Sequence, residues 1–139
     1  MTLFLDTTAL LGRYLEGNDR RVVLDAMSRD PHWCASALAL SESMMLVERL
    51  GDDRGRTDAV RSALRDDWER ICVIPVDQAC LDRAAELGRT QPVGTSDALH
   101  LAAADRLPRP LSFATFDPSQ IPIALALGFE VISGHTDPR

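Results

Sequence analysis

The chain has 139 residues, a length that suits one compact domain, and we expect residues 1–139 to form a single unit. Its hydrophobic content of 45% is enough for a core, yet no apolar run approaches the roughly 20 residues that a membrane span needs. The net charge of −6 argues against nucleic-acid binding through an overwhelmingly basic surface. All 15 basic residues are arginine, which excludes any mechanism that requires a lysine.

The opening residues and the cysteines favour a cytoplasmic protein. The first five residues lead directly to an acid at Asp6, without the basic and long apolar regions of a secretory signal. Cys34, Cys72 and Cys80 are irregularly spaced, which is typical of free thiols rather than of a disulfide framework or a zinc site. We therefore expect a cytoplasmic location and no membrane association.

Short apolar runs alternate along the chain with longer segments of helical periodicity. Strands are expected at Leu3–Leu5, His32–Ala35, Ile71–Ile74, Leu111–Ala114 and Glu130–Ile132. Helices are expected at Thr8–Glu16, Arg20–Arg29, Ala37–Leu50, Thr57–Glu69, from an Asp77 cap to about Arg89, from a Thr95 or Ser96 cap through Asp105, and at Ser119–Leu127. Strands separated by helices predict a mainly parallel sheet with helices on both faces, and such sheets bind ligands beyond the carboxyl ends of their strands.

Two acids follow strands of this predicted sheet. Asp6 comes directly after the first strand, and Asp117 comes three residues after the fourth. A buried acid at a strand exit is costly unless it is paired or binds a cation. Each acid also has a purely structural explanation, because Asp6 can cap the helix from Thr8 and Asp117 can form a turn before Pro118.

Glu42 is expected on the apolar side of its helix, in a stripe with Leu38, Met45 and Leu46. No arginine lies three or four residues away to pair with it. A half-buried acid in that position needs a partner from elsewhere, either a cation or a distant arginine.

Asp97 lies in the first turn of an apolar helix. The helix dipole favours an acid there by about 0.3–1 kcal/mol, so stability alone could explain it. Together, however, the four acids would repel one another in a partly buried site unless a cation held them. Carboxylates without His or Cys favour Mg²⁺ or Mn²⁺ over zinc. For His100 we expect a packed or capping role rather than ligation.

Four segments of the chain resemble the PIN-domain family. They are Leu5-Asp6-Thr7-Thr8-Ala9-Leu10, Ser41-Glu42, Thr95-Ser96-Asp97-Ala98-Leu99-His100-Leu101-Ala102-Ala103-Ala104 and Phe113-Ala114-Thr115-Phe116-Asp117, of which the third is the most specific. The resemblance extends over nearly the whole chain, and the compact form is similar to the VapC toxins of bacterial toxin–antitoxin pairs.

This resemblance implies a three-layer α/β/α fold around a mainly parallel sheet of about five strands. It also implies a Mg²⁺- or Mn²⁺-dependent endoribonuclease that hydrolyses RNA with a metal-activated water, a homodimer, and a cognate antitoxin that covers the acidic groove. The catalytic and metal-ligating roles carry over to Asp6, Glu42, Asp97 and Asp117. The residues expected to lie behind these ligands and orient them are Thr7, Thr8 and Ser96.

RNA has to reach an acidic pocket, and Arg54 and Arg56 are the predicted contacts to its phosphates. Arginines on an exposed helix are usually only solvated, so this role stays open. Met44, Met45 and Leu46 can supply a hydrophobic patch for a dimer or for the antitoxin, or can fill the core instead.

Other functions fit parts of the pattern. Receiver domains and haloacid-dehalogenase phosphatases also place an aspartate after the first strand, but both need a lysine near the phosphoryl group, and the chain has none. A PIN-like module that binds a partner protein or RNA without cleaving it is the alternative from a different class, although four intact acids disfavour it. Cleavage of DNA also stays open, because metal–carboxylate chemistry does not itself select the sugar.

Overall fold

A five-stranded parallel sheet forms the centre of the computed structural model, which describes residues 1–51 and 53–134. The strand order is β3-β2-β1-β4-β5, and all neighbouring strands run parallel. The strands are β1 Thr2–Leu5, β2 His32–Ser36, β3 Cys72–Ile74, β4 Leu111–Ala114 and β5 Glu130–Ile132. The predicted strands are therefore confirmed, with bounds within one residue of those expected.

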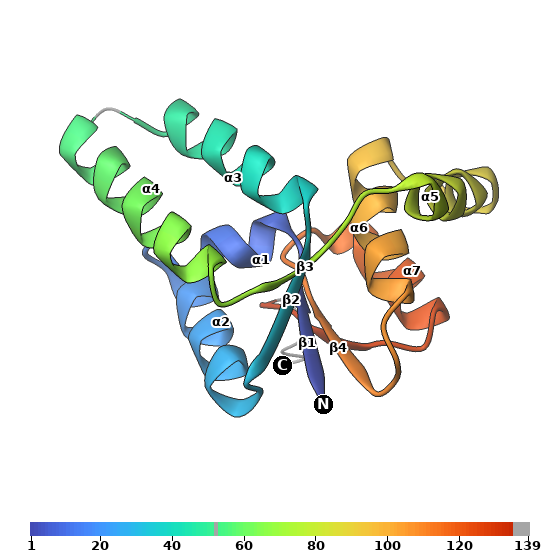
Figure 1. Ribbon diagram of the computed structural model, residues 1–139. Coiled ribbons are helices and arrows are strands. Elements are labelled where there is room, and N and C mark those ends of the chain that lie inside the picture. The colour runs from blue at the N-terminus through green and yellow to red at the C-terminus, as the bar shows by residue number, and fades with distance from the viewer. Residues whose placement is uncertain (52, 135–139) are drawn as a thin grey trace.

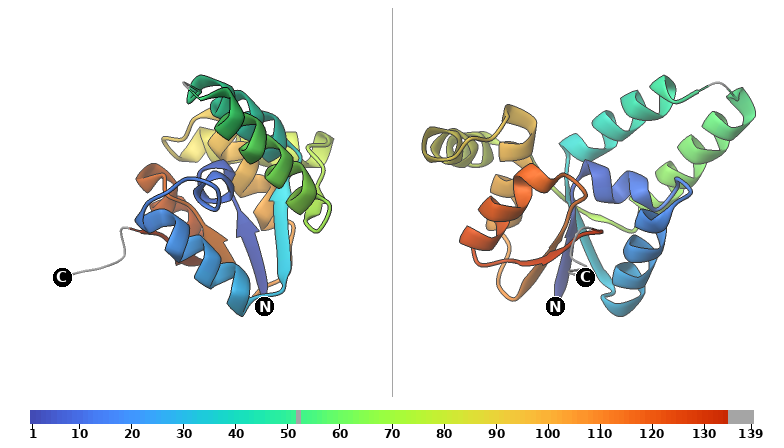
Figure 2. Two further views of the ribbon diagram at one scale, coloured as in Figure 1. Left: turned by 90° about the vertical axis from the view of Figure 1, so that its left-hand side faces the viewer. Right: turned by 180° about the vertical axis from the view of Figure 1, so that it is seen from behind.

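Helices cover both faces of this sheet (Figures 1 and 2). They are α1 Thr7–Gly12, α2 Asn18–Arg29, α3 Leu38–Arg49, α4 Arg54–Trp68, α5 Gln78–Thr90, α6 Thr95–Asp105 and α7 Ile121–Ala126, with a 3-10 turn η1 at Pro118–Gln120. Helices α1 to α4 lie on one side of the sheet in Figure 1 and α5 to α7 on the other, so the predicted α/β/α fold is confirmed. Within the described residues, no helix has the length and apolar character needed to cross a membrane.

Side-chain alternation along β1 supplies a core on each face of the sheet. Phe4 points to the α5–α7 layer, where its ring stacks on Phe113 at 5.4 Å, and Phe113 stacks on Phe129 at 5.7 Å. Leu3 and Leu5 belong to the core beneath α1 to α4. These β1 residues are fully buried. The residue that follows β1 is therefore held in place by packing from both faces.

The chain connections create a switch point between β1 and β4. From β1 the chain crosses one face and returns as β2, whereas β4, on the other side of β1, is reached across the opposite face. Doubly wound sheets bind ligands at such a point. The β1–β4 ladder ends at the pair Leu5–Ala114, and the Asp6 N–H still donates to the Ala114 carbonyl at 3.2 Å. The residues that leave these two strands therefore start side by side.

The first helix is shorter than predicted. The segment Thr8–Glu16 was expected to be helical throughout, but α1 ends at Gly12 and turns follow. A Cβ atom at position 12 would lie 3.0 Å from the Phe116 ring, so glycine allows a close approach that other residues would hinder. The other predicted helices are found with ends shifted by at most three residues.

The start of α6 also differs from the prediction. Neither Thr95 nor Ser96 caps this helix, because Gly94 is the N-cap residue and both lie inside the first turn. The Gly94 carbonyl accepts the Ala98 N–H at 2.9 Å, and no side chain of the described residues caps the helix. Glycine is tolerated at an N-cap, and the carboxylate of Asp97 is then the acidic group of the first turn.

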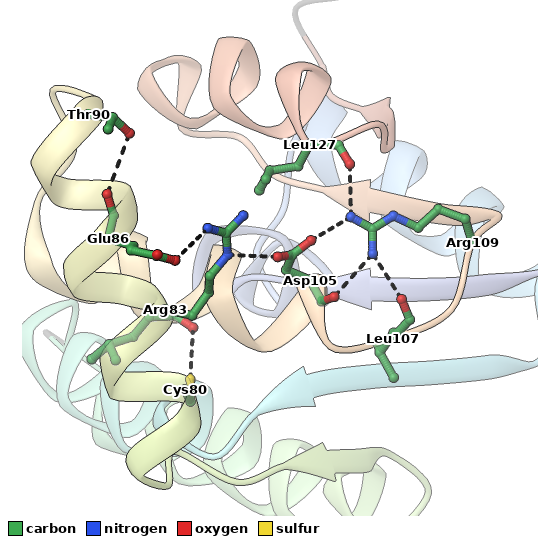
Figure 3. Close-up of polar contacts among 9 residues, drawn as sticks. Cys80, Arg83, Glu86, Thr90, Asp105, Leu107, Arg109 and Leu127 are labelled. Carbon is green, nitrogen blue, oxygen red and sulfur yellow. Dashed lines mark hydrogen bonds and ion pairs between the residues drawn. The ribbon is translucent and has the colours of Figure 1, made fainter.

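The far end of α6 is fastened to its neighbours through Asp105 (Figure 3). The Asp105 carboxylate accepts from Arg83 of α5 at 2.9 Å and from Arg109 at 2.6 Å. Arg109 also donates to the Leu127 carbonyl, just after α7, at 2.8 Å. These contacts fix α6 relative to α5 and α7, and with it the position of Asp97.

Candidate active site

A small pocket opens at the carboxyl ends of β1 and β4, with a volume of about 130 Å³. Its lining residues come from the exit of β1 and from α1, α3, α6 and η1: Asp6, Thr7, Thr8, Glu42, Leu46, Asp97, His100 and Gln120. Three of the predicted acids therefore line one pocket. The fourth, Asp117, lies beside Asp97 and influences its pKa.

Asp6 is almost completely buried, and its carboxylate accepts four hydrogen bonds. Its Oδ1 accepts from the Ala9 N–H at 2.9 Å and from the Thr8 hydroxyl at 2.7 Å. Its Oδ2 accepts from the Thr115 hydroxyl at 2.5 Å and from the Gln120 amide at 2.7 Å. Asp6 thus caps α1, which is the structural role considered for it in the sequence. Burial raises the pKa of Asp6, and the surrounding donors offset part of that rise.

Two hydroxyl groups join Asp6 to the loop after β4. Thr8 Oγ1 donates to Asp6 and accepts the Phe116 N–H at 2.9 Å. Thr115 Oγ1 donates to Asp6 and accepts the Asp117 N–H at 3.0 Å. Thr8 therefore lies next to Asp6, on the side of the loop after β4. Thr115 is not among the predicted site residues, and its position directly after β4 is the signal that could have identified it.

Replacing Thr115 with Val should lower the free energy of unfolding by about 1–3 kcal/mol, because the isosteric side chain leaves the Asp117 N–H without its acceptor and Asp6 without one donor. Urea denaturation followed by circular dichroism would measure this loss. Thr90→Val, on an exposed residue of α5, is the matched control and should change stability by less than about 0.5 kcal/mol. Equal effects of the two substitutions would show that the two hydrogen bonds of the Thr115 hydroxyl do not stabilise the fold.

Asp97 and Asp117 form an acid pair at the mouth of this site. Burial, the hydrogen bond to Asp117 and the negative charges of Asp117 and Asp6 raise the pKa of Asp97 to about 6. Burial would also raise the pKa of Asp117, but hydrogen bonds from the hydroxyl and the N–H of Ser119 lower it below its usual value. Asp117 caps η1 through the same N–H, so the turn role considered for it is also correct.

Glu42 enters the pocket from α3 and has its partners on α1 and α6. The Thr7 hydroxyl donates to Oε1 at 2.5 Å, and His100 Nε2 lies 2.7 Å from the same oxygen. The hydrogen bond with His100, aided by Thr7 and Ser96, holds the pKa of Glu42 below its usual range. Thr7 and Ser96 thus lie next to Glu42, one of the predicted ligands. The partner that Glu42 lacks in its own helix is a histidine and not the distant arginine considered above.

His100 is 1% exposed and connects three elements, which confirms the packed role expected for it. Its Nδ1 lies 2.9 Å from Ser36 Oγ on β2, and its Nε2 contacts Glu42 and, at 3.0 Å, Thr7 Oγ1. Because an ionised carboxylate only accepts hydrogen bonds, Nε2 carries a hydrogen, and in the neutral ring Nδ1 then accepts from Ser36. His100 therefore fixes the orientation of the Glu42 carboxylate.

The prediction that Glu42 shares the buried face of its helix with Met45 and Leu46 is wrong. Met45 is 58% exposed and Leu46 is 36% exposed. The buried residues of α3 are instead Ala39, Ser43 and Val47. Two of these are small, so α3 can approach α1 closely, and Glu42 is left at the edge of the buried face with its carboxylate toward the pocket.

Gln120, the last residue of η1, is a pocket residue that is not among the predicted site residues. It is 1% exposed, and its Nε2 donates to Asp6 Oδ2 at 2.7 Å and to Asp97 Oδ1 at 3.3 Å. Its Oε1 has no hydrogen-bond partner within the described part of the chain. A polar residue in a single 3-10 turn has no periodic pattern, so no sequence signal distinguishes Gln120 from an exposed loop residue.

The donor groups of the pocket match a hard divalent cation, since carboxylate and amide oxygens are the ligands that Mg²⁺ and Mn²⁺ prefer. The orphaned Oε1 of Gln120 is one such oxygen. Among residues 1–51 and 53–134, no three His, Cys, Asp or Glu side chains already converge as ligands. Two contacts account for this: the Gln120 amide bonds to both Asp6 and Asp97, and Glu42 is turned toward Thr7 and His100.

The two predicted RNA-binding arginines lie on α4, outside the lining of the acidic pocket. Arg54 is exposed and pairs with Glu48 at 3.1 Å and with Asp58 at 3.6 Å. Arg56 lines a separate cavity of about 340 Å³, formed mainly between the end of α3 and the start of α4. The structure therefore does not bring these two arginines together with the acids.

The fold and the pocket define an α/β protein with a carboxylate-rich site at the switch point of its parallel sheet. The sequence matches the PIN domain over residues 3–125, and the chain belongs to the PIN-domain family. The resemblance found in the sequence is thereby confirmed. Comparison with curated proteins gives no match.

Solved structures with this fold include toxins of toxin–antitoxin systems. The chain is similar to Mycobacterium tuberculosis VapC20, a toxin that cleaves the sarcin–ricin loop, with 17% identity, a TM-score of 0.69, and coverage of 88% of this chain and 95% of that one. DNA-bound VapBC from Salmonella typhimurium gives 18% identity, a TM-score of 0.66, and coverage of 96% and 98%. FitAcB from Neisseria gonorrhoeae gives 17% identity, a TM-score of 0.69, and coverage of 94% and 96%. At these identities the likeness shows the fold.

Proposed function

We propose that the protein is a Mg²⁺- or Mn²⁺-dependent endoribonuclease and the toxin of a toxin–antitoxin pair. The observation that carries the proposal is the meeting of Asp6, Asp97 and Asp117 at the switch point, with the pKa of Asp97 raised to about 6 by burial and by its acidic neighbours. The raised pKa means that the charge of Asp97 is unfavourable in the folded protein, so a function that requires this charge is the better explanation. The RNA-cleaving activity of VapC20, on the same fold, supports this choice of substrate.

The residues of the pocket would act as a rigid set of oxygen donors. Asp6 and Asp97 would hold the cation, with Glu42 and Asp117 shaping its surroundings. The hydroxyls of Thr8 and Thr115 orient Asp6, and the His100–Thr7 pair orients Glu42. When bound, the cation would lower the pKa of a water molecule and stabilise the charge that develops on the scissile phosphate.

Two kinds of contact with other molecules belong to the same proposal. Of the predicted patch, Met45 is 58% and Leu46 36% exposed, whereas Met44 packs against the core. A homodimer or an antitoxin would cover the exposed pair. VapBC belongs to a family of toxin–antitoxin systems, which supports an antitoxin as partner. Arg54 and Arg56 would contact RNA only where a substrate extends from the pocket toward α4.

The test is RNA cleavage by the purified protein, freed of any copurifying partner. We expect discrete fragments from total RNA in Mg²⁺ or Mn²⁺, and no fragments in EDTA or with Asp6→Asn. The Asp6→Asn protein should keep its circular dichroism spectrum, because the asparagine oxygen can still cap α1. If the folded wild type binds Mn²⁺ but leaves a panel of structured cellular RNAs intact, the nuclease proposal fails and a PIN-like binding module becomes the better description.

A further inference from the structure

Gln120 differs from the other pocket residues because only one of the two polar groups of its side-chain amide makes hydrogen bonds. The NH₂ group bonds to the two carboxylates that matter most to the proposed site, those of Asp6 and Asp97. The Oε1 atom is buried and has no hydrogen-bond partner among residues 1–51 and 53–134. A buried, unpaired carbonyl oxygen is destabilising in a folded protein, so its presence beside an acidic cluster calls for an explanation.

The other donors to Asp6 are held in place by a second attachment. The Ala9 N–H belongs to the backbone of α1, and the Thr8 and Thr115 hydroxyls each accept a backbone N–H from the loop after β4. The Gln120 side chain has no comparable second attachment within the described part of the chain, where its Oε1 accepts no hydrogen bond. Asp6 already accepts four hydrogen bonds, about the capacity of a carboxylate, so a cation can reach it only if one donor leaves. The Gln120 amide is the donor that is free to do so.

We propose that the side-chain amide of Gln120 occupies the cation position between Asp6 and Asp97 in the metal-free protein, and that it turns to offer Oε1 as an additional ligand when the cation binds. This inference rests on the metal site of the proposed function and extends it to a residue outside the four acids. The NH₂ group, with its partial positive charge, takes the place of the cation between two carboxylates. After the turn, the carbonyl oxygen that is now unpaired gains a partner.

The chemistry of the amide suits both states. Glutamine presents two donor hydrogens on one side of its terminal carbon and an acceptor oxygen on the other, so rotation of the terminal group exchanges a donor for an acceptor at the same place. Amide oxygens are accepted ligands of hard divalent cations. The exchange also explains why the acids do not converge as ligands in the present structure.

Mn²⁺ binding to EDTA-treated protein, followed by electron paramagnetic resonance, tests the proposal without relying on activity. Gln120→Met keeps the length of the side chain but removes the oxygen, and it should weaken Mn²⁺ binding about tenfold to a hundredfold. Gln120→Glu keeps an oxygen and should bind Mn²⁺ at least as tightly as the wild type. Gln78→Met makes the same change at an exposed position of α5 and should leave the affinity unaltered.

A second measurement uses the unaltered protein, so it does not depend on the folding of a variant. The side-chain NH₂ resonances of Gln120, assigned in a ¹⁵N-labelled sample, should shift on saturation with Mg²⁺ because their hydrogen bonds to Asp6 and Asp97 are broken. Those of Gln78 should not move. Unchanged Gln120 resonances in the Mg²⁺-loaded protein would overturn the inference.

The outcomes separate this inference from the proposed function. Tight Mn²⁺ binding by the wild type together with equal affinity in Gln120→Met would refute the role of Gln120 and leave the metal site standing. No Mn²⁺ binding by the folded wild type would overturn both. Weakened binding in Gln120→Met, preserved binding in Gln120→Glu and a shifted amide resonance would together establish Gln120 as a ligand.

Discussion

Replacing Asp97 with Asn is expected to abolish RNA cleavage and, in the same protein, to raise the stability of the metal-free form. Asn removes a negative charge from the carboxylate cluster, and its amide can donate to Asp117 where two negative charges now repel each other. Loss of a cation ligand removes several kcal/mol of transition-state stabilisation, which corresponds to about a thousandfold or more in rate. A residue retained only for stability would give the opposite sign for the second effect.

The stability gain of Asp97→Asn should depend on pH in a defined direction. The pKa of Asp97 is raised from 3.8 to about 6 in the folded protein. Such an acid destabilises the folded state fully above pH 6, and the penalty fades as the pH falls toward 3.8. The melting temperature of the variant in EDTA should therefore exceed that of the wild type most at pH 7.5 and less at pH 5. Because Asp97 is only partly buried, solvent screening limits the gain to about 1 kcal/mol, or roughly 3–4 °C.

Asp66→Asn is the matched control for this experiment. Asp66 is an exposed acid on α4, so the same chemical change there should alter neither RNA cleavage nor the melting temperature beyond experimental error. Wild-type cleavage by Asp97→Asn would remove this acid from the proposed active site. A lower melting temperature at pH 7.5 would show that Asp97 stabilises the fold and that the cluster is not under electrostatic strain.

The positions of Asp6 and Asp117 could be predicted because a parallel sheet brings the exits of its strands to one edge. The apolar runs identify the strands, and alternation with helices makes them parallel, so acids placed just after β1 and β4 must lie near the switch point. Asp97 joins them because α6 starts at the same edge of the sheet. For these acids, local sequence position alone determines the location.

The environment of Glu42 could not be predicted in the same way. Helical periodicity places Glu42 on one apolar face with Met45 and Leu46. In the structure a different face of α3, with Ala39 and Ser43, packs against its neighbours, so Met45 and Leu46 are exposed. Its partner His100 is 58 residues away in the chain. Gln120 is likewise defined by a hydrogen bond to Asp6 that spans more than a hundred residues. Contacts of this kind follow from the assembled fold and have no local signature.

Asparagine and glutamine at position 100 should separate the role of His100 in orienting Glu42 from its role in packing. A glutamine amide nitrogen can lie near the present Nε2 atom and keep a donor for Glu42, whereas an asparagine amide reaches only as far as Nδ1 and keeps the contact to Ser36. We expect His100→Asn to lower RNA cleavage about tenfold to a hundredfold, the usual effect of removing a group that orients a metal ligand. His100→Gln should retain most of the activity.

Both substitutions at position 100 should lower the free energy of unfolding by about 1–3 kcal/mol, because each leaves one end of the buried Ser36–His100–Glu42 chain unpaired. A purely structural histidine would therefore give two variants with equal losses of stability and equal activities. Urea denaturation and single-turnover RNA cleavage of the same preparations would distinguish the cases. Unequal activity at equal stability would show that His100 orients Glu42. Activity that falls in proportion to stability would show that His100 has only a structural role.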